Sequence, residues 1–143
     1  EVMADTRFEP GELDCLIVNT TGELKHFYEH ATVIFIGKSL TAEGGQNPIE
    51  PGALGKAMVF GPNMQNFAEV VRSFLQQDGA VQVRDAAELE RVLGELLADE
   101  SRREQLGQNA LKVFRGNLGG IDRTVDMIVK QLVPPREARL SAT

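Results

Sequence analysis

The sequence predicts a single α/β domain in which a parallel sheet is covered by helices on both faces. Short apolar runs alternate with amphipathic stretches, and two of these runs lead into glycine-rich loops. Continuous apolar runs are typical of strands buried on both faces, and their alternation with helices favours parallel pairing. At 143 residues, with 42% hydrophobic and 25% charged residues, the chain has the size and composition of one globular domain.

Four apolar runs are predicted to be central strands, at residues 16–18, 33–36, 58–60 and 80–83. The polar segments at the two ends carry no apolar face. We therefore expect a loosely ordered lead-in over residues 1–14, a domain over residues 15–133 and a flexible tail over residues 134–143.

The predicted helices each begin near a capping residue or end near glycine or proline. The first covers residues 22–30, with Leu24, Phe27 and Tyr28 on one face, and a short one covers residues 49–54. A third begins at Asn63 or Gln65, and Asp78-Gly79 ends it. Its apolar stripe is formed by Phe67, Val70, Val71, Phe74 and Leu75.

Asp85 and Glu88 predict a capped start for the next helix, whose buried face holds Leu89, Val92, Leu93, Leu96 and Leu97. A further helix is expected to end near Gly116. The last is expected over residues 121–132, with four inward side chains: Val125, Ile128, Val129 and Leu132.

Composition excludes several function classes. The net charge is −6 and the basic residues are scattered, so no nucleic-acid partner is expected. No apolar run approaches the ~20 residues of a membrane-spanning helix, which favours a soluble chain. Cys15 is the single cysteine and is predicted to be a buried core residue. His26 and His30 lack a third ligand nearby and are interpreted as surface residues, so no metal site is expected.

The candidate site lies where the second and third predicted strands end. Their loops contain Gly44, Gly45 and Gly61, and each loop leads into a helix. Ligands of open α/β sheets bind at the carboxyl ends of strands, and helix N-termini favour anions. We expect the backbone amides of residues 44–47 and the Asn47 side chain to face a phosphate. An ordinary connecting loop is the alternative.

Four segments, taken together, resemble the C-terminal domain of the 3-deoxy-D-manno-octulosonic acid (Kdo) transferases. They are Asn-Thr-Thr-Gly-Glu-Leu at 19–24, Gly-Lys-Ser-Leu at 37–40, Gly-Gly-Gln-Asn-Pro-Ile-Glu-Pro at 44–51 and Gly-Pro-Asn-Met-Gln-Asn-Phe at 61–67. The resemblance implies a Rossmann-like half of a GT-B glycosyltransferase that holds a CMP-sugar donor, CMP-Kdo. It also implies that the acceptor site and the catalytic carboxylate belong to an N-terminal domain of the same protein, so no catalytic residue and no cofactor are assigned to this chain.

The resemblance implies a set of substrate-binding residues: Gly22, Glu23, Ser39, Gly44, Gly45, Gln46, Asn47, Glu50 and Asn63. Glu50 would accept hydrogen bonds from the ribose hydroxyls, or only favour the helix dipole. Ser39 would contact the phosphate or satisfy the strand end. Glu23 would border the base or only start a helix, and Asn63 would contact the donor or cap a helix.

Three positions depart from the family pattern, which has Asp, Gly and His where this chain has Asn19, Lys38 and Gln46. A lysine adds charge to the loop, and glutamine cannot carry a proton near neutral pH as histidine can. The alternative interpretation of Lys38 is a solvated loop charge. These differences bear on which sugar is bound.

The resemblance implies that the whole enzyme transfers Kdo from CMP-Kdo to a lipid A precursor in lipopolysaccharide synthesis. Its place would be the cytoplasmic face of the bacterial inner membrane. Two alternatives remain open. One is another GT-B glycosyltransferase or a sugar-nucleotide epimerase with a different donor, and the other is a non-catalytic nucleotide-binding domain.

Overall fold

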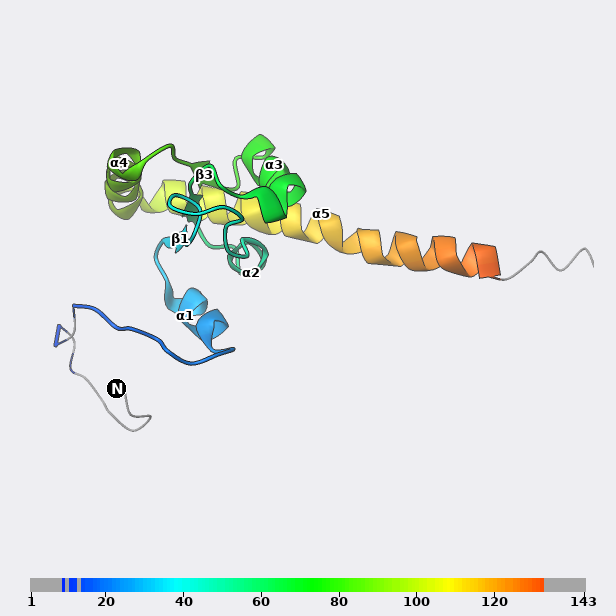
Figure 1. The fold of residues 1–143 in the computed structure, drawn as a ribbon, viewed down its shortest axis with the longest axis horizontal. Helices are drawn as coiled ribbons and strands as arrows, with labels where there is room; N and C mark the ends of the chain where they lie inside the picture. The colour runs from blue at the N-terminus through cyan, green and yellow to red at the C-terminus, as the bar shows by residue number, and fades with distance from the viewer. Residues whose placement is uncertain (1–8, 10, 13, 133–143) are drawn as a thin grey trace, which may run out of the picture.

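The fold is that of a computed structural model, which describes residues 9, 11–12 and 14–132 of the chain. It is a small α/β body from which one long helix projects (Figure 1). Most of the lead-in and all of the tail predicted above lie outside the described residues. Side chains are described through residue 117 and again at Met127 and Ile128.

Three parallel strands form the sheet, in the order β1 (Ile34–Ile36), β2 (Met58–Phe60) and β3 (Val81–Gln82). Ile34 pairs with Met58, and Phe60 pairs with Gln82. The prediction of a parallel sheet is thus confirmed. Three of the four predicted strands are present, in the predicted order along the chain.

The predicted strand at residues 16–18 is wrong. This segment has no regular secondary structure, and Ile17 is 80% exposed. A strand needs a partner edge for its backbone hydrogen bonds, and none of the described residues provides one to this segment. Cys15, predicted to be buried, is exposed for the same reason.

The helices are α1 (Leu24–His30), α2 (Ile49–Ala53), α3 (Ala68–Gln76), α4 (Ala86–Ala98) and α5 (Glu100–Leu132), with a 3₁₀ turn, η1 (Gln65–Phe67), before α3. Asp85 caps α4 as predicted, because its Oδ1 accepts the Glu88 N–H at 2.8 Å. Glu88 Oε2 reaches one residue further than a capping box requires and accepts the Arg84 N–H at 2.8 Å.

The predicted break between two C-terminal helices is wrong, since α5 runs through Gly116 without interruption. A glycine costs a helix interior only about 1 kcal/mol relative to alanine, so it weakens a helix without ending it. Ile128, predicted to be buried, is 52% exposed. The far half of α5 extends away from the body (Figure 1).

Two apolar clusters lie on the two faces of the sheet, so the prediction of helices on both faces is confirmed. One joins Ile34, Ile36, Met58 and Phe60 to α3 and to the middle of α5. The other joins Val59 and Val83 to α4 and to the first turns of α5. Four side chains predicted on inner faces are exposed: Leu24 at 50%, Phe27 at 41%, Leu75 at 37% and Leu97 at 61%.

Helix α5 contacts the segments that lead into β2 and β3. A Cβ on Gly107 would lie 1.9 Å from the Gly55 carbonyl oxygen, and a Cβ on Gly79 would lie 2.9 Å from the Ala110 nitrogen. Only glycine permits such close backbone approach. The helix therefore supports the amino ends of the strands, opposite the loops at their carboxyl ends.

We expect Gly107→Ala to lower the free energy of unfolding by about 1–3 kcal/mol, because the added methyl group must displace backbone atoms. Gly94→Ala is the matched control. A Cβ there meets nothing within 4 Å, and Gly94 lies inside α4. This variant is expected to gain roughly 0.5–1 kcal/mol from helix propensity. Urea unfolding of both variants measures the difference, and equal effects would contradict the contact.

Candidate functional site

The two loops that follow β1 and β2, at residues 37–47 and 61–66, are joined through Ser39. This serine is 0% exposed. Its hydroxyl donates to the Ile36 carbonyl oxygen at 2.5 Å and accepts the Gly61 N–H at 2.8 Å. The Asn63 N–H also donates to the Ser39 carbonyl oxygen, at 2.9 Å. A hydroxyl with both functions in use favours the strand-end interpretation of Ser39 over a phosphate contact.

Gly61 and Asn63 complete the link between the loops. A Cβ on Gly61 would lie 2.3 Å from the Ser39 carbonyl oxygen, so the chains approach more closely than another residue allows. The Asn63 side-chain amide donates to the Leu40 carbonyl oxygen at 3.3 Å. Both residues therefore hold the shape of the loops, whichever ligand these bind.

Gly44 and Gly45 are buried and have positive φ angles of 100° and 59°. A Cβ on Gly45 would lie 2.3 Å from the Met64 sulfur, and one on Gly44 would lie 2.7 Å from the Asn66 side-chain nitrogen. The positive φ angles favour glycine at both positions, and an added Cβ would also have to displace the Met64 and Asn66 side chains. The second loop packs directly on them.

Two of the backbone amides expected to face an anion already donate within the protein. The Gly44 N–H donates to Gln65 Oε1 at 2.9 Å, and the Gln46 N–H donates to the Gly37 carbonyl oxygen at 3.1 Å. The expectation of free amides at these two residues is therefore wrong. They fix the loop to its neighbours, while the Gln46 side chain is exposed.

Asn47 orients the start of α2 and the side chain of Glu50. Its Oδ1 accepts the Ile49 N–H at 2.9 Å, and its Nδ2 donates to Glu50 Oε1 at 3.0 Å. The Asn47 side chain, expected to be free, thus has both ends engaged. Glu50 is exposed, in the first turn of a helix of only five residues, so its carboxylate is accessible to a ligand.

The sequence pattern predicts that Tyr28 lies on the inner face of α1, but it does not indicate that Tyr28 lies near Glu50 of the candidate site. Burial raises the pKa of the Tyr28 hydroxyl, and the negative charge of Glu50 raises it further. The Lys56 ammonium donates to the Glu29 and Ala31 carbonyl oxygens at 2.7 and 3.2 Å. These contacts hold the end of α1 against the body, with Tyr28 on the side of Glu50.

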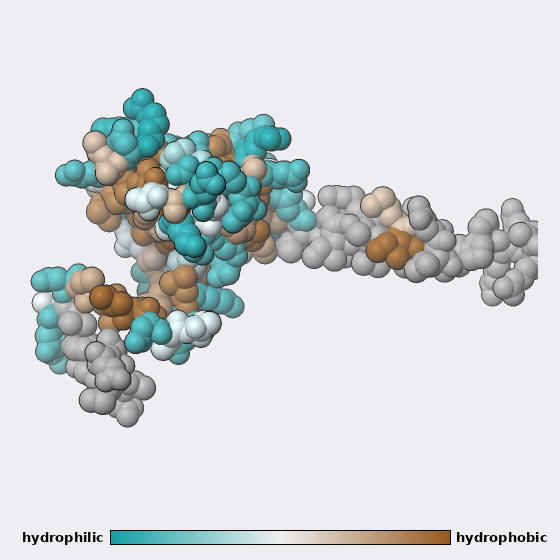
Figure 2. All heavy atoms as spheres, in the orientation of Figure 1, coloured by the Kyte–Doolittle hydropathy of each residue, from teal (hydrophilic) through white to brown (hydrophobic). Residues whose placement is uncertain are grey.

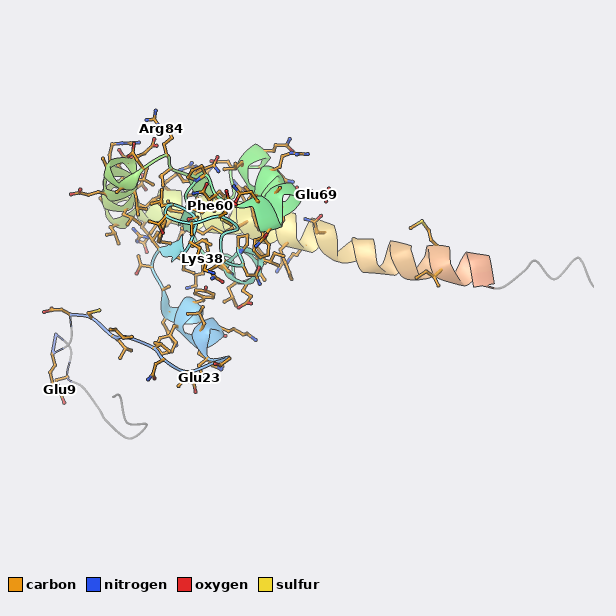
Figure 3. The ribbon with its side chains drawn as sticks, viewed as in Figure 1. Glu9, Glu23, Lys38, Phe60, Glu69 and Arg84 are labelled. Atoms are coloured by element: carbon orange, nitrogen blue, oxygen red, sulfur yellow. The ribbon has the colours of Figure 1, made fainter. Side chains whose placement is uncertain are left out.

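Gly22 and Glu23 are not brought into the paired loops. Both are exposed at the start of α1, and the Thr20 hydroxyl donates to Glu23 Oε2 at 2.5 Å. Figure 3 shows Glu23 at the end of α1 that lies away from Lys38. Lys38 itself is exposed on the first loop, with a φ of 60° that is unusual for a residue other than glycine.

Among the described residues, no group of three or more His, Cys, Asp or Glu side chains could hold a metal ion. Nor does any helix of the described part combine the length and apolar character needed to cross a membrane.

Fold and loops together define a Rossmann-like α/β domain with its candidate site at the carboxyl ends of β1 and β2. No protein-family model matches the chain. A solved structure does: the crystal structure of the C-terminal CMP-Kdo binding domain of WaaA from Acinetobacter baumannii. It superposes with a TM-score of 0.63 at 33% sequence identity, over 67% of this chain and 50% of that one.

Two relatives carry the same family name, 3-deoxy-D-manno-octulosonic acid transferase. The protein from Haemophilus influenzae is 32% identical over 114 residues, which is 79% of this chain and 27% of the relative. The protein from Bordetella pertussis is 32% identical over 121 residues, which is 84% of this chain and 28% of the relative. The chain is a homologue of the Kdo transferases, related to their C-terminal domain, and it spans about a quarter of the length of these two relatives.

We expect Ser39→Ala to lower the free energy of unfolding by about 1–3 kcal/mol, because it leaves the buried Gly61 N–H without an acceptor. Ser73→Ala is the matched control, since the Ser73 hydroxyl only donates to the Glu69 carbonyl oxygen of its own helix, at 3.2 Å. Its effect should stay within ~0.5 kcal/mol. Chemical denaturation of the two variants gives the comparison, and similar losses would remove the special role of Ser39.

Proposed function

We propose that this chain is the donor-binding part of a glycosyltransferase of the Kdo transferase type, and that it binds a CMP-sugar. The observation that carries the proposal is the match to a solved CMP-Kdo binding domain at 33% identity and a TM-score of 0.63. The loops that bear three of the four family segments also lie at the carboxyl ends of adjacent parallel strands. Nucleotides bind at that end of open α/β sheets.

In this proposal, Glu50 accepts hydrogen bonds from the ribose hydroxyls. Asn47 holds one of its carboxylate oxygens at 3.0 Å and so limits the rotation of the side chain. A carboxylate beside a phosphate is repulsive unless hydroxyl groups lie between them, which suits a nucleoside phosphate better than inorganic phosphate. Gln46 and Lys38 are two exposed side chains of the first loop that can donate to the phosphate or to the sugar carboxylate.

The whole enzyme would transfer Kdo from CMP-Kdo to a hydroxyl group of a lipid A precursor, at the cytoplasmic face of the bacterial inner membrane. The acceptor and the catalytic base would come from the N-terminal acceptor domain. This chain would bind the donor and stabilise the departing CMP electrostatically as negative charge develops on its phosphate.

A different sugar donor is the second candidate, and Lys38 is the observation that favours it. Its backbone has a φ of 60°, a conformation that glycine adopts without cost and that the Kdo transferase pattern fills with glycine. The lysine places a positive charge and a long side chain where the family pattern has no side chain. A donor that carries a further acidic group would be attracted electrostatically by the Lys38 ammonium.

We expect the 143-residue chain to bind CMP weakly, and Glu50→Ala to weaken this binding about tenfold or more. Losing a hydrogen bond to a charged group costs on the order of 1.5–3 kcal/mol. Titration with CMP, followed by amide NMR, measures both affinities. Shifts are expected at residues 44–50 and 61–63, the loops that the structure brings together; residues 22–23 lie outside them.

Glu100→Ala is the control for removing a charge. Like Glu50, Glu100 is an exposed acidic residue in the first turn of a helix, but it begins α5. It should bind CMP as the parent does. A Glu50→Ala variant with parental affinity, or shifts centred elsewhere, would end the assignment of this donor site.

The isolated chain should not transfer sugar. The acceptor site and the base are proposed to lie in the domain that this chain does not contain, and a bound donor without an acceptor cannot react by transfer. Incubation with CMP-Kdo and a lipid A precursor, followed by mass spectrometry of the lipid, tests this. Transfer above the rate without protein would show that this chain holds the base.

A further inference from the structure

The side chain of Gln65 joins the glycine pair of the first loop, Gly44 and Gly45, to the second loop. Gln65 begins η1, the 3₁₀ turn that leads from the second loop into α3. Its Oε1 accepts the Gly44 N–H at 2.9 Å, across a separation of 21 residues. Ser39 links the two loops at the strand ends, so Gln65 provides a second link between them at the glycine pair.

The glycine pair is the part of the first loop whose backbone has the most freedom to lose. Glycine has no Cβ and gives up more conformational freedom on folding than any other residue. Gly44 and Gly45 adopt φ angles of 100° and 59°, and Met64 and Asn66 of the second loop lie close to them. Each residue that is fixed in one conformation costs entropy. The hydrogen bond to Gln65 offsets part of this cost and favours the observed conformation.

Glu50 and Gln46 depend on this hydrogen bond to different degrees. Glu50 belongs to α2, which packs on α3, because a Cβ on the buried Gly52 would lie 2.7 Å from the Phe74 ring. The exposed Gln46 directly follows the glycine pair. Its N–H donates to the Gly37 carbonyl oxygen at 3.1 Å, a contact inside the first loop that does not fix this loop against the second. The place of Gln46 relative to Glu50 therefore depends on the conformation of the glycine pair.

We propose that Gln65 is a positioning residue of the candidate site. Its side-chain carbonyl holds residues 44–47 in the conformation that binds the donor, and so sets the place of Gln46 relative to Glu50. Gln65 acts through the backbone of Gly44 and does not contact the donor. The inference rests on the proposed function for the identity of the ligand, a CMP-sugar, whereas the hydrogen bond itself is independent of that function.

The exposure of Gln65 allows this hydrogen bond to be removed without unfolding the protein. Gln65 is one of the exposed residues of the body, whose surface carries many hydrophilic residues (Figure 2). When an exposed acceptor is removed, water can take its place beside the donor. The free energy of unfolding should then change little, while the first loop gains freedom.

The test removes the acceptor and keeps the length of the side chain. The carbonyl oxygen of glutamine accepts hydrogen bonds, whereas the thioether sulfur of methionine is a weak acceptor. In Gln65→Met we expect solvent exchange of the Gly44 amide proton, measured by NMR, to accelerate roughly 2- to 10-fold, and the affinity for CMP to fall by a similar factor. Gln65→Glu keeps an oxygen acceptor at the same position and should restore slow exchange at Gly44. Its added charge near a phosphate excludes it from the CMP comparison.

Gln76→Met is the matched control. Gln76 is an exposed glutamine at the end of α3, and glutamine and methionine have similar helix propensities. This variant should leave both the exchange of the Gly44 amide and the affinity for CMP unchanged.

Three results for Gln65→Met overturn the inference. Parental exchange at Gly44 would show that the hydrogen bond does not hold the loop. Faster exchange with parental CMP affinity would show that its role is only structural. Tighter binding of CMP would show that Gln65 competes with the phosphate for the Gly44 N–H. A parent chain that does not bind CMP removes the proposed function and the donor role of Gln65 with it, while exchange at Gly44 still decides whether Gln65 holds the loop.

Discussion

The buried hydroxyl of Ser39 is the contact on which the site depends. It accepts from the first residue after β2 and donates to the last residue of β1, so the two strand ends and their loops form one unit. A hydroxyl can do this because it is both donor and acceptor. Gly61 allows the second strand end to approach, and Gly44 and Gly45 allow the first loop to lie against the second.

This tight construction determines what the loops can offer a ligand. The amides of Gly44 and Gln46 and the side chain of Asn47 are engaged in holding the backbone. Glu50, Lys38 and the Gln46 side chain project outward instead. A ligand here would contact these outward side chains, while the backbone groups hold the loops in place. This is what is expected of a binding site on a rigid scaffold.

Three helices, α3, α4 and α5, hold the sheet in place. Helix α5 contacts the segments before β2 and β3 through glycines, and α3 and α4 cover the two faces of the sheet. The sheet is well covered over β2 and open beyond β1. The candidate site therefore lies beside the least covered edge of the described part of the sheet.

The sequence by itself determined the three strands of the sheet, their parallel pairing and the glycine-rich loops, because buried apolar runs and glycine positions follow from local chemistry. It also determined the cap of α4 at Asp85, a contact between residues three apart. Tertiary structure decided the rest. Residues 16–18 have the composition of a strand, yet a strand forms only beside a partner edge, which sequence pattern does not reveal. The role of Ser39 also depends on tertiary structure, because its second hydrogen-bond partner is 22 residues away. So does the position of Tyr28 near Glu50, which depends on how α1 packs against the body.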